Sequence, residues 1–222
     1  MLIGVPKEIK QQEHRIGLTP ESVKALTIKG HQVLVENNGG FEAGFSNEDY
    51  KNAGAEIENK ASEIFKNSDL IVKVKEPQKK EIDMIRENQI IYTYFHLAAA
   101  KNLTEGLIKS KSICIAYETV TDENGKLPLL APMSAVAGRM SIQAGAHSLE
   151  KNQKGRGLLL GGAPGVASAN VVILGGGVVG ENAALIATGM RAKVFIVDKS
   201  SKRLKELSSE ELDDQKRFLL NH

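Results

Sequence analysis

The chain has 222 residues, 41% of them hydrophobic and 25% charged, which is ordinary for a soluble globular protein of one or two domains. Its 29 basic and 27 acidic residues leave a net charge of +2, so the overall charge does not favour binding to nucleic acid or to a membrane. The most basic segment, which contains Lys73, Lys75, Lys79 and Lys80, is interrupted by acidic residues and is predicted to be mostly a solvated face.

No segment predicts export or membrane insertion. The N-terminus, Met1 to Pro6, lacks the basic start and long apolar core of a signal peptide. The longest charge-free stretch, residues 157–180, is divided by glycines, a proline and an asparagine into loop, strand and turn. The single cysteine, Cys114, cannot form an internal disulfide, and its apolar neighbours predict a small buried core residue. We therefore expect a soluble cytoplasmic protein.

The first 130 residues alternate short β-branched runs with helical patterns, which predicts α/β organisation. The expected strands are residues 2–5, 32–36, 70–74, 90–94 and 113–116, and the expected helices are 20–29, 46–53 and 100–109. The first helix begins with Thr19 as N-cap and Pro20 at the first helical position, and Gly30 ends it. A longer helix is expected over 132–153, where small side chains allow close approach to neighbouring backbone.

A dinucleotide site is predicted in the last quarter of the chain. The apolar run 171–174 predicts a buried parallel strand, and three glycines follow it with the spacing of a turn that brings backbone N–H groups against a pyrophosphate. These glycines are Gly175, Gly177 and Gly180. A second strand, 193–197, ends at Asp198, eighteen residues after the last glycine. A carboxylate there would accept hydrogen bonds from an adenosine ribose and favour NAD over NADP.

Four polar residues fall at strand ends or in the segments that follow, where ligands bind in open α/β sheets. They are Arg15, Lys75, His96 and Ser134. Arg15 could clamp a carboxylate with two parallel hydrogen bonds, and His96 could exchange a proton near neutral pH. Structural roles are the more common outcome for three of them, an exposed surface for Arg15 and Lys75 and packing or capping for His96, and helix capping explains Ser134 equally well. The histidines and the cysteine lack metal-ligand spacing, so no metal site is predicted.

Several segments taken together resemble the alanine dehydrogenases. They are residues 4–8 (GVPKE), 13–20 (EHRIGLTP), 73–77 (KVKEP), 95–98 (FHLA) and 157–166 (GLLLGGAPGV), followed by the glycine turn. The resemblance extends in order over roughly residues 1–207, which is more specific than any one motif. The related NAD-binding subunit of proton-translocating transhydrogenase shares the opening segment and the glycine turn. It lacks the histidine that corresponds to His96, which favours the dehydrogenase.

The resemblance implies a reversible, NAD-dependent oxidative deamination of L-alanine to pyruvate and ammonium, in L-alanine catabolism. Arg15 and Lys75 would hold the carboxylate and carbonyl end of the substrate, and His96 would act as general acid/base. Beside the glycines, the NAD site would be lined by Ser134, Val178, Val179, Asp198 and Arg203. The resemblance also implies a homo-oligomer, commonly a hexamer.

The predicted organisation is a substrate domain over residues 1–130, a connector helix over 131–155 and the start of a Rossmann-type NAD domain over 156–222. After Leu207 the sequence is polar and the resemblance fades. Two strands alone would leave an apolar sheet edge unpaired. We therefore expect a C-terminally truncated form that is not active by itself. Two alternatives stay open, a transhydrogenase-type subunit that passes hydride to a partner and an inactive fragment.

Overall fold

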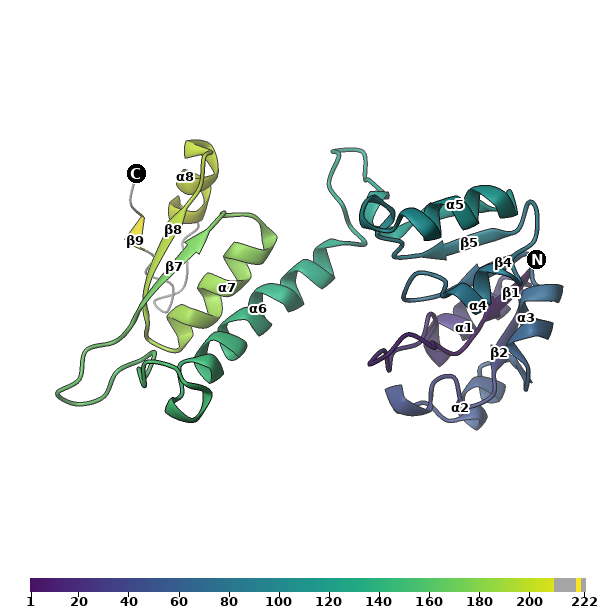
Figure 1. Ribbon diagram of the computed structural model, residues 1–222, viewed down its shortest axis with the longest axis horizontal. Helices are drawn as coiled ribbons and strands as arrows, with labels where there is room; N and C mark the ends of the chain where they lie inside the picture. Colours follow the sequence, from purple (N-terminus) through teal and green to yellow (C-terminus); the bar gives the residue numbers. More distant parts are fainter. Residues whose placement is uncertain (210–218, 221–222) are drawn as a thin grey trace. The chain divides into compact units, whose positions relative to one another are not determined.

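The computed structural model describes residues 1–209 and 219–220, which fall into two compact units, Met1–Leu127 and Pro128–His222 (Figure 1). The first unit is built on a six-stranded sheet in which every pairing is parallel. Its strands are β1 (Leu2–Val5), β2 (Gln32–Glu36), β3 (Glu56–Glu58), β4 (Leu70–Val72), β5 (Ile90–Thr93) and β6 (Ile113–Ala116). The predicted α/β fold is confirmed. Of these strands, only β3 was not expected, and β4 and β5 end slightly earlier than predicted.

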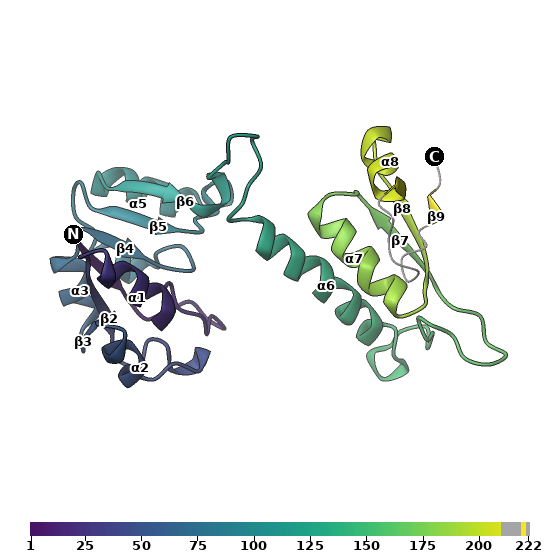
Figure 2. The same ribbon diagram turned by 180° about the vertical axis from the view of Figure 1, so that it is seen from behind.

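Helices cover both faces of this sheet (Figure 2). They are α1 (Pro20–Ile28), α2 (Asn47–Asn52), α3 (Ala61–Asn67), α4 (Lys79–Ile82) and α5 (Lys101–Ser110), with 3-10 turns η1 (Phe41–Ala43), η2 (Leu97–Ala99) and η3 (Tyr117–Thr119). Thr19 caps α1 by accepting a hydrogen bond from the Ser22 N–H, as its position in the sequence predicts. One core joins α1 and α2 to the sheet, and a second joins α3 and α5 to it. The unit is therefore a doubly wound α/β sheet.

The strand order β3-β2-β1-β4-β5-β6 reverses direction between β1 and β4. In an open parallel sheet such a reversal leaves a crevice at the carboxyl ends of the two strands, because their following connections leave toward opposite sides. The loop after β1 and the segment after β4 meet there. A Cβ added at Gly17 would lie 2.5 Å from the Val72 carbonyl oxygen, so the β1 loop packs directly on the end of β4.

Lys73 lies directly after β4 and is fully buried, which corrects the prediction that it belongs to a solvated face. Its ammonium lies 3.0 Å from Glu8 and 2.7 Å from Glu81, whose carboxylates are also buried. An ammonium can be buried only where carboxylates replace its hydration shell. In the sequence, Lys73 lies among residues of alternating charge, which predicts exposure to solvent. In the folded protein, its charge is instead neutralised by the two buried carboxylates.

Cys114 is exposed, which corrects its assignment to the core. It lies on β6, the strand at one edge of the sheet, where three of the four residues are exposed. An apolar β-branched run predicts a strand, but its burial depends on whether the strand is central or at an edge, and the sequence does not show this.

The second unit contains α6 (Ala131–Ser148), η4 (Lys151–Gln153), β7 (Asn170–Leu174), α7 (Val178–Gly189), β8 (Lys193–Val197), α8 (Ser201–Ser209) and β9 (Leu219–Leu220). The long helix ends at Ser148 rather than running to residue 153. The three strands are parallel in the order β7-β8-β9, so β8 has a neighbour on each side. The expectation of only two strands was wrong, because Leu219–Leu220 pairs with Phe195–Ile196.

Helices α6 and α7 run side by side at close range (Figures 1 and 2). A Cβ added at Gly138 would lie 2.2 Å from the Val179 carbonyl oxygen, so no larger residue fits there. The Arg139 Nε donates to the Asn182 Oδ1 at 3.0 Å across the same contact. This packing confirms that the small residues of α6 serve close helix approach. Among the described residues, no helix is both long and apolar enough to cross a membrane.

We expect Lys73→Met to lower the free energy of unfolding by about 3–5 kcal/mol, because it leaves two buried carboxylates without their counter-ion. Urea unfolding would measure the change. The matched control is Lys66→Met, which removes an exposed lysine 3.8 Å from Glu63 and should change stability by less than about 0.5 kcal/mol. Equal losses in the two variants would contradict a structural role for the buried ion cluster.

Candidate functional site

The first unit brings Arg15, Lys75 and His96 to one edge of its sheet. Arg15 lies in the loop after β1, Lys75 follows β4, and His96 follows β5, and these three strands are neighbours. Carboxyl ends of adjacent parallel strands open into one crevice, so the three residue types gather where an open α/β sheet binds its ligand. The predicted substrate residues therefore share a location, although they are far apart in sequence.

Arg15 is held by Glu13 through two parallel hydrogen bonds. Its Nε donates to Glu13 Oε1 at 2.8 Å and its Nη2 donates to Glu13 Oε2 at 2.7 Å. Hydrogen bonding to the Arg15 guanidinium lowers the pKa of Glu13 from 4.5 to about 2, so the carboxylate stays ionised at neutral pH. This forked pairing fixes the plane of the guanidinium, and a second anion must bind in the orientation that Glu13 sets.

Lys75 is half-buried, and its ammonium makes no hydrogen bond or ion pair among the described residues. The backbone that carries it is nevertheless fixed, since the Val74 and Lys75 N–H groups both point at the Glu8 carboxylate. The carbonyl of Lys75 accepts a hydrogen bond from the Thr93 hydroxyl at 2.9 Å. A cation on an anchored backbone at the end of a strand is suited to hold an anionic or carbonyl group of a small substrate.

His96 is exposed and takes a left-handed backbone conformation, with φ of 53°. Glu118 stabilises this conformation, because its Oε1 accepts hydrogen bonds from the N–H groups of Phe95 at 3.0 Å and His96 at 2.8 Å. The adjacent Tyr117 ring packs edge-on against Tyr94, with centroids 4.8 Å apart. The imidazole is therefore presented outward from a supported turn, as a group that exchanges protons with a ligand requires.

In the second unit, one pocket of about 470 Å³ gathers most of the predicted cofactor residues. Its lining includes Ser134, Gly175, Gly177, Val178, Val179 and Gly180. It lies at the N-terminus of α7, where backbone N–H groups have no intrahelical partner and the helix dipole favours an anion. Among the residues that the structure describes, no side chain caps this helix, and Cβ atoms added at Gly175 or Gly177 would meet no atom within 4 Å. The turn therefore fits the pyrophosphate of a dinucleotide.

Asp198 and Arg203 hold the glycine turn through hydrogen bonds to Gly176. Asp198 accepts hydrogen bonds from the Gly176 N–H at 2.6 Å and the Ser200 N–H at 2.8 Å, which lower the pKa of its carboxyl group. Arg203 donates from Nε to the Gly176 carbonyl at 2.7 Å and from Nη2 to Glu181 at 2.6 Å. Both side chains thus act on Gly176, a contact that the glycine spacing alone did not reveal.

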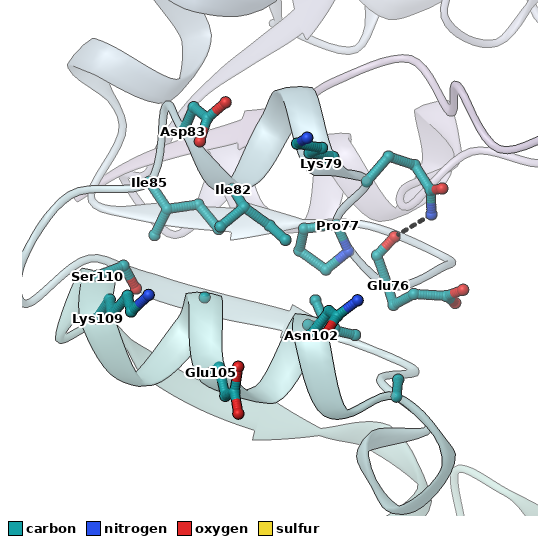
Figure 3. A pocket seen from close by; sticks show the side chains of 14 residues that line it. Glu76, Pro77, Lys79, Ile82, Asp83, Ile85, Asn102, Glu105, Lys109 and Ser110 are labelled. Carbon is teal, nitrogen blue, oxygen red and sulfur yellow. Dashed lines mark hydrogen bonds between the residues drawn. The ribbon is translucent and has the colours of Figure 1, made fainter.

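A separate groove of about 810 Å³ lies in the first unit between α4 and α5 (Figure 3). Ile82 and Pro77 line it from one side and Asn102 and Glu105 from the other. None of the sequence-predicted site residues lines this groove. Size alone therefore does not locate the candidate site, which lies where the charged residues gather.

Four supporting residues were missed by sequence reasoning. They are Glu8, Glu13, Lys73 and Glu118. A signal existed for Lys73, because it continues the alternation of Ile71 on a strand whose two faces are both buried. A lysine in that register must meet a carboxylate. Glu118 gave no such signal, since it lies 22 residues beyond His96 and meets it only in the folded chain.

The two units together define a protein of the α/β class with a dinucleotide-type fold in its second part. The chain matches the model of the alanine dehydrogenase/PNT N-terminal domain over residues 4–137 and that of the C-terminal domain over residues 141–216. It belongs to the alanine dehydrogenase/PNT family.

Relatives in this family support the same assignment. An alanine dehydrogenase of Halomonas elongata is 54% identical over 207 residues, which is 93% of this chain and 56% of that protein. A solved L-alanine dehydrogenase is 49% identical with a TM-score of 0.91, over all of this chain and 61% of its own. A transhydrogenase from Sinorhizobium meliloti, 22% identical over 94% of this chain and 60% of its own, shares the fold with a TM-score of 0.79. The chain thus spans about half the length of the curated relatives it matches.

Acid should weaken the first unit through Glu13. The pKa of this carboxyl is 4.5 ordinarily and about 2 in the folded protein, so its contribution to stability is present above 4.5 and is lost as the pH falls toward about 2. We expect the difference in unfolding free energy between the wild type and Glu13→Gln to shrink over that range. Urea unfolding at a series of pH values would measure it, with the exposed Glu56→Gln as control. A difference that stays constant would contradict the pairing.

We expect Gly180→Ala to destabilise the second unit, because the added Cβ would lie 1.8 Å from the Gly175 carbonyl oxygen. Displacing packed backbone costs about 1–3 kcal/mol. Gly177→Ala is the matched control, since no atom lies within 4 Å of its added Cβ and its φ of −70° suits any residue. Thermal unfolding would separate the two variants, and equal melting temperatures would refute the close approach.

Proposed function

We propose that this chain carries the substrate-binding and the first NAD-binding residues of an NAD-dependent alanine dehydrogenase, which converts L-alanine reversibly to pyruvate and ammonium. The observation that carries the proposal is the gathering of Arg15, Lys75 and His96 at the carboxyl edge of one sheet. A cation pair and a proton-exchanging imidazole are the groups that a small 2-amino or 2-keto acid requires. The alanine dehydrogenase relatives at about 50% identity support the same activity.

In this proposal the first unit supplies substrate binding and proton transfer. Arg15 binds the substrate carboxylate through its guanidinium, whose plane Glu13 sets. Lys75 contacts the oxygen or nitrogen on the neighbouring carbon. His96 takes a proton from the amino or hydroxyl group in one direction and returns it in the other. Residues 1–130 then form the substrate domain, and residues 131–155 connect it to the NAD domain.

The second unit supplies the cofactor site. The residues proposed to hold NAD are Ser134, Gly175, Gly177, Val178, Val179, Gly180, Asp198 and Arg203. The N-terminus of α7 binds the pyrophosphate, and Asp198 accepts hydrogen bonds from the adenosine ribose while it holds the glycine turn. Arg203 acts mainly by fixing Gly176 and Glu181. When bound, NAD supplies the hydride acceptor for the reaction. We also propose a cytoplasmic homo-oligomer, a hexamer as the family resemblance implies.

A transhydrogenase-type subunit is the alternative, because the matched family models cover PNT proteins as well as alanine dehydrogenases. It would bind NAD but not pyruvate. His96, in a supported turn beside the substrate cations, supports the dehydrogenase instead.

The test is calorimetric titration of the protein with NAD and with pyruvate, beside NADH formation from L-alanine. We expect both ligands to bind, and His96→Ala to reduce turnover by about 100-fold or more. Arg15→Ala should abolish pyruvate binding and leave NAD binding unchanged, because the proposed pyruvate site lies in the first unit and the proposed NAD site in the second. Binding of NAD alone would support the transhydrogenase reading, and binding of neither ligand would indicate an inactive fragment.

A further inference from the structure

We propose that Glu8 is a positioning residue for Lys75, which sets where the ammonium of Lys75 meets the substrate. The inference rests on the proposed function, because it assumes that Lys75 contacts a small keto or amino acid. It adds a residue that touches no substrate itself and acts through the backbone of its neighbour.

The contacts of Glu8 divide between its two oxygens. Its Oε2 lies 3.0 Å from the Lys73 ammonium, and its Oε1 accepts the N–H of Val74 at 2.6 Å and that of Lys75 at 3.3 Å. The side chain is 2% exposed, so water does not compete for these contacts. One carboxylate from the loop after β1 therefore holds three consecutive residues after β4.

The far end of the same segment is also anchored. Glu81 shares the Lys73 ammonium at 2.7 Å, and its other oxygen accepts the Gln78 N–H at 2.7 Å. The Gln78 side chain in turn donates to the Glu76 carbonyl at 2.9 Å, the dashed bond in Figure 3. Lys75 thus lies on a short stretch whose backbone is tied at both ends. Its side chain can reach only a limited volume, and preorganised groups bind with less loss of conformational freedom.

Glu8 also relates Lys75 to Arg15. Glu8, Glu13 and Arg15 line one small hollow at the end of β1. The backbone of Lys75 and the guanidinium of Arg15 are therefore both held by carboxylates of the same loop, residues 6–19 between β1 and α1. Restricting where two cations can lie favours a ligand whose anionic and carbonyl groups fit them both.

The test compares Glu8→Gln with Glu81→Gln. A glutamine at position 8 must turn its NH₂ group either toward the Lys73 ammonium or toward the Val74 and Lys75 N–H groups, so one contact becomes donor against donor. The Glu81→Gln control also removes a carboxylate from Lys73 but makes no contact with Val74 or Lys75. Both variants should lower the melting temperature, because both remove a carboxylate from Lys73. A larger loss of pyruvate affinity in Glu8→Gln than in Glu81→Gln would therefore report positioning rather than stability.

We expect Glu8→Gln to raise the pyruvate Kd about tenfold, as a displaced binding group does, with NAD affinity unchanged. Glu81→Gln should raise the pyruvate Kd by less, about two- to threefold, since it loosens the far end of the segment and leaves the contacts of Glu8 with the Val74 and Lys75 N–H groups intact. Hydrogen exchange of the Val74 and Lys75 amides should accelerate in Glu8→Gln only. An unchanged pyruvate Kd in Glu8→Gln, or an equal rise in both variants, would overturn the inference. If the wild type binds no pyruvate, the proposed function fails, while amide exchange still decides whether Glu8 holds the Lys75 segment.

Discussion

The burial of one lysine between two glutamates is the constraint on which the first unit depends. Lys73 lies at the end of a central strand, and its ammonium is fully enclosed with Glu8 and Glu81. Separating these charges from water is costly, and their mutual attraction compensates only when all three are held in place. Burial raises the pKa of Glu81 even beside Lys73. Because Glu8 comes from the β1 loop, the same cluster ties together the two loops that meet where the strand order reverses.

The two candidate sites use different parts of the polypeptide for recognition. In the candidate site of the first unit, side chains are oriented by other side chains, as Glu13 does for Arg15 and Glu118 does for the turn of His96. In the second unit, glycines without side chains leave backbone N–H groups accessible at a helix N-terminus. Asp198 holds this turn by accepting a hydrogen bond from the Gly176 N–H. The proposed small substrate would need placed charges, whereas a pyrophosphate binds backbone N–H groups, which every residue except proline has.

Much of the fold and of the site could be predicted from local sequence. The strands of the first sheet, the cap of α1 and the glycine turn follow from β-branched runs, a Thr-Pro start and glycine spacing, which act over a few residues. Three expectations failed for a shared reason. Lys73 is buried, Cys114 is exposed, and Leu219–Leu220 adds a third strand to the second sheet. Each outcome depends on which element lies beside the residue, and that neighbour is distant in the chain.

The sequence by itself determined the α/β class and the family. It also identified the charged candidate residues and the glycines whose backbone N–H groups are accessible. All of these depend on residue type and spacing. The tertiary structure alone decided how those residues are supported. Glu8 and Glu118 gain their roles only when segments after different strands meet at one sheet edge, whereas Glu13 pairs with Arg15 within one loop. Strand order sets that meeting, and strand order comes from packing between distant segments rather than from any local pattern.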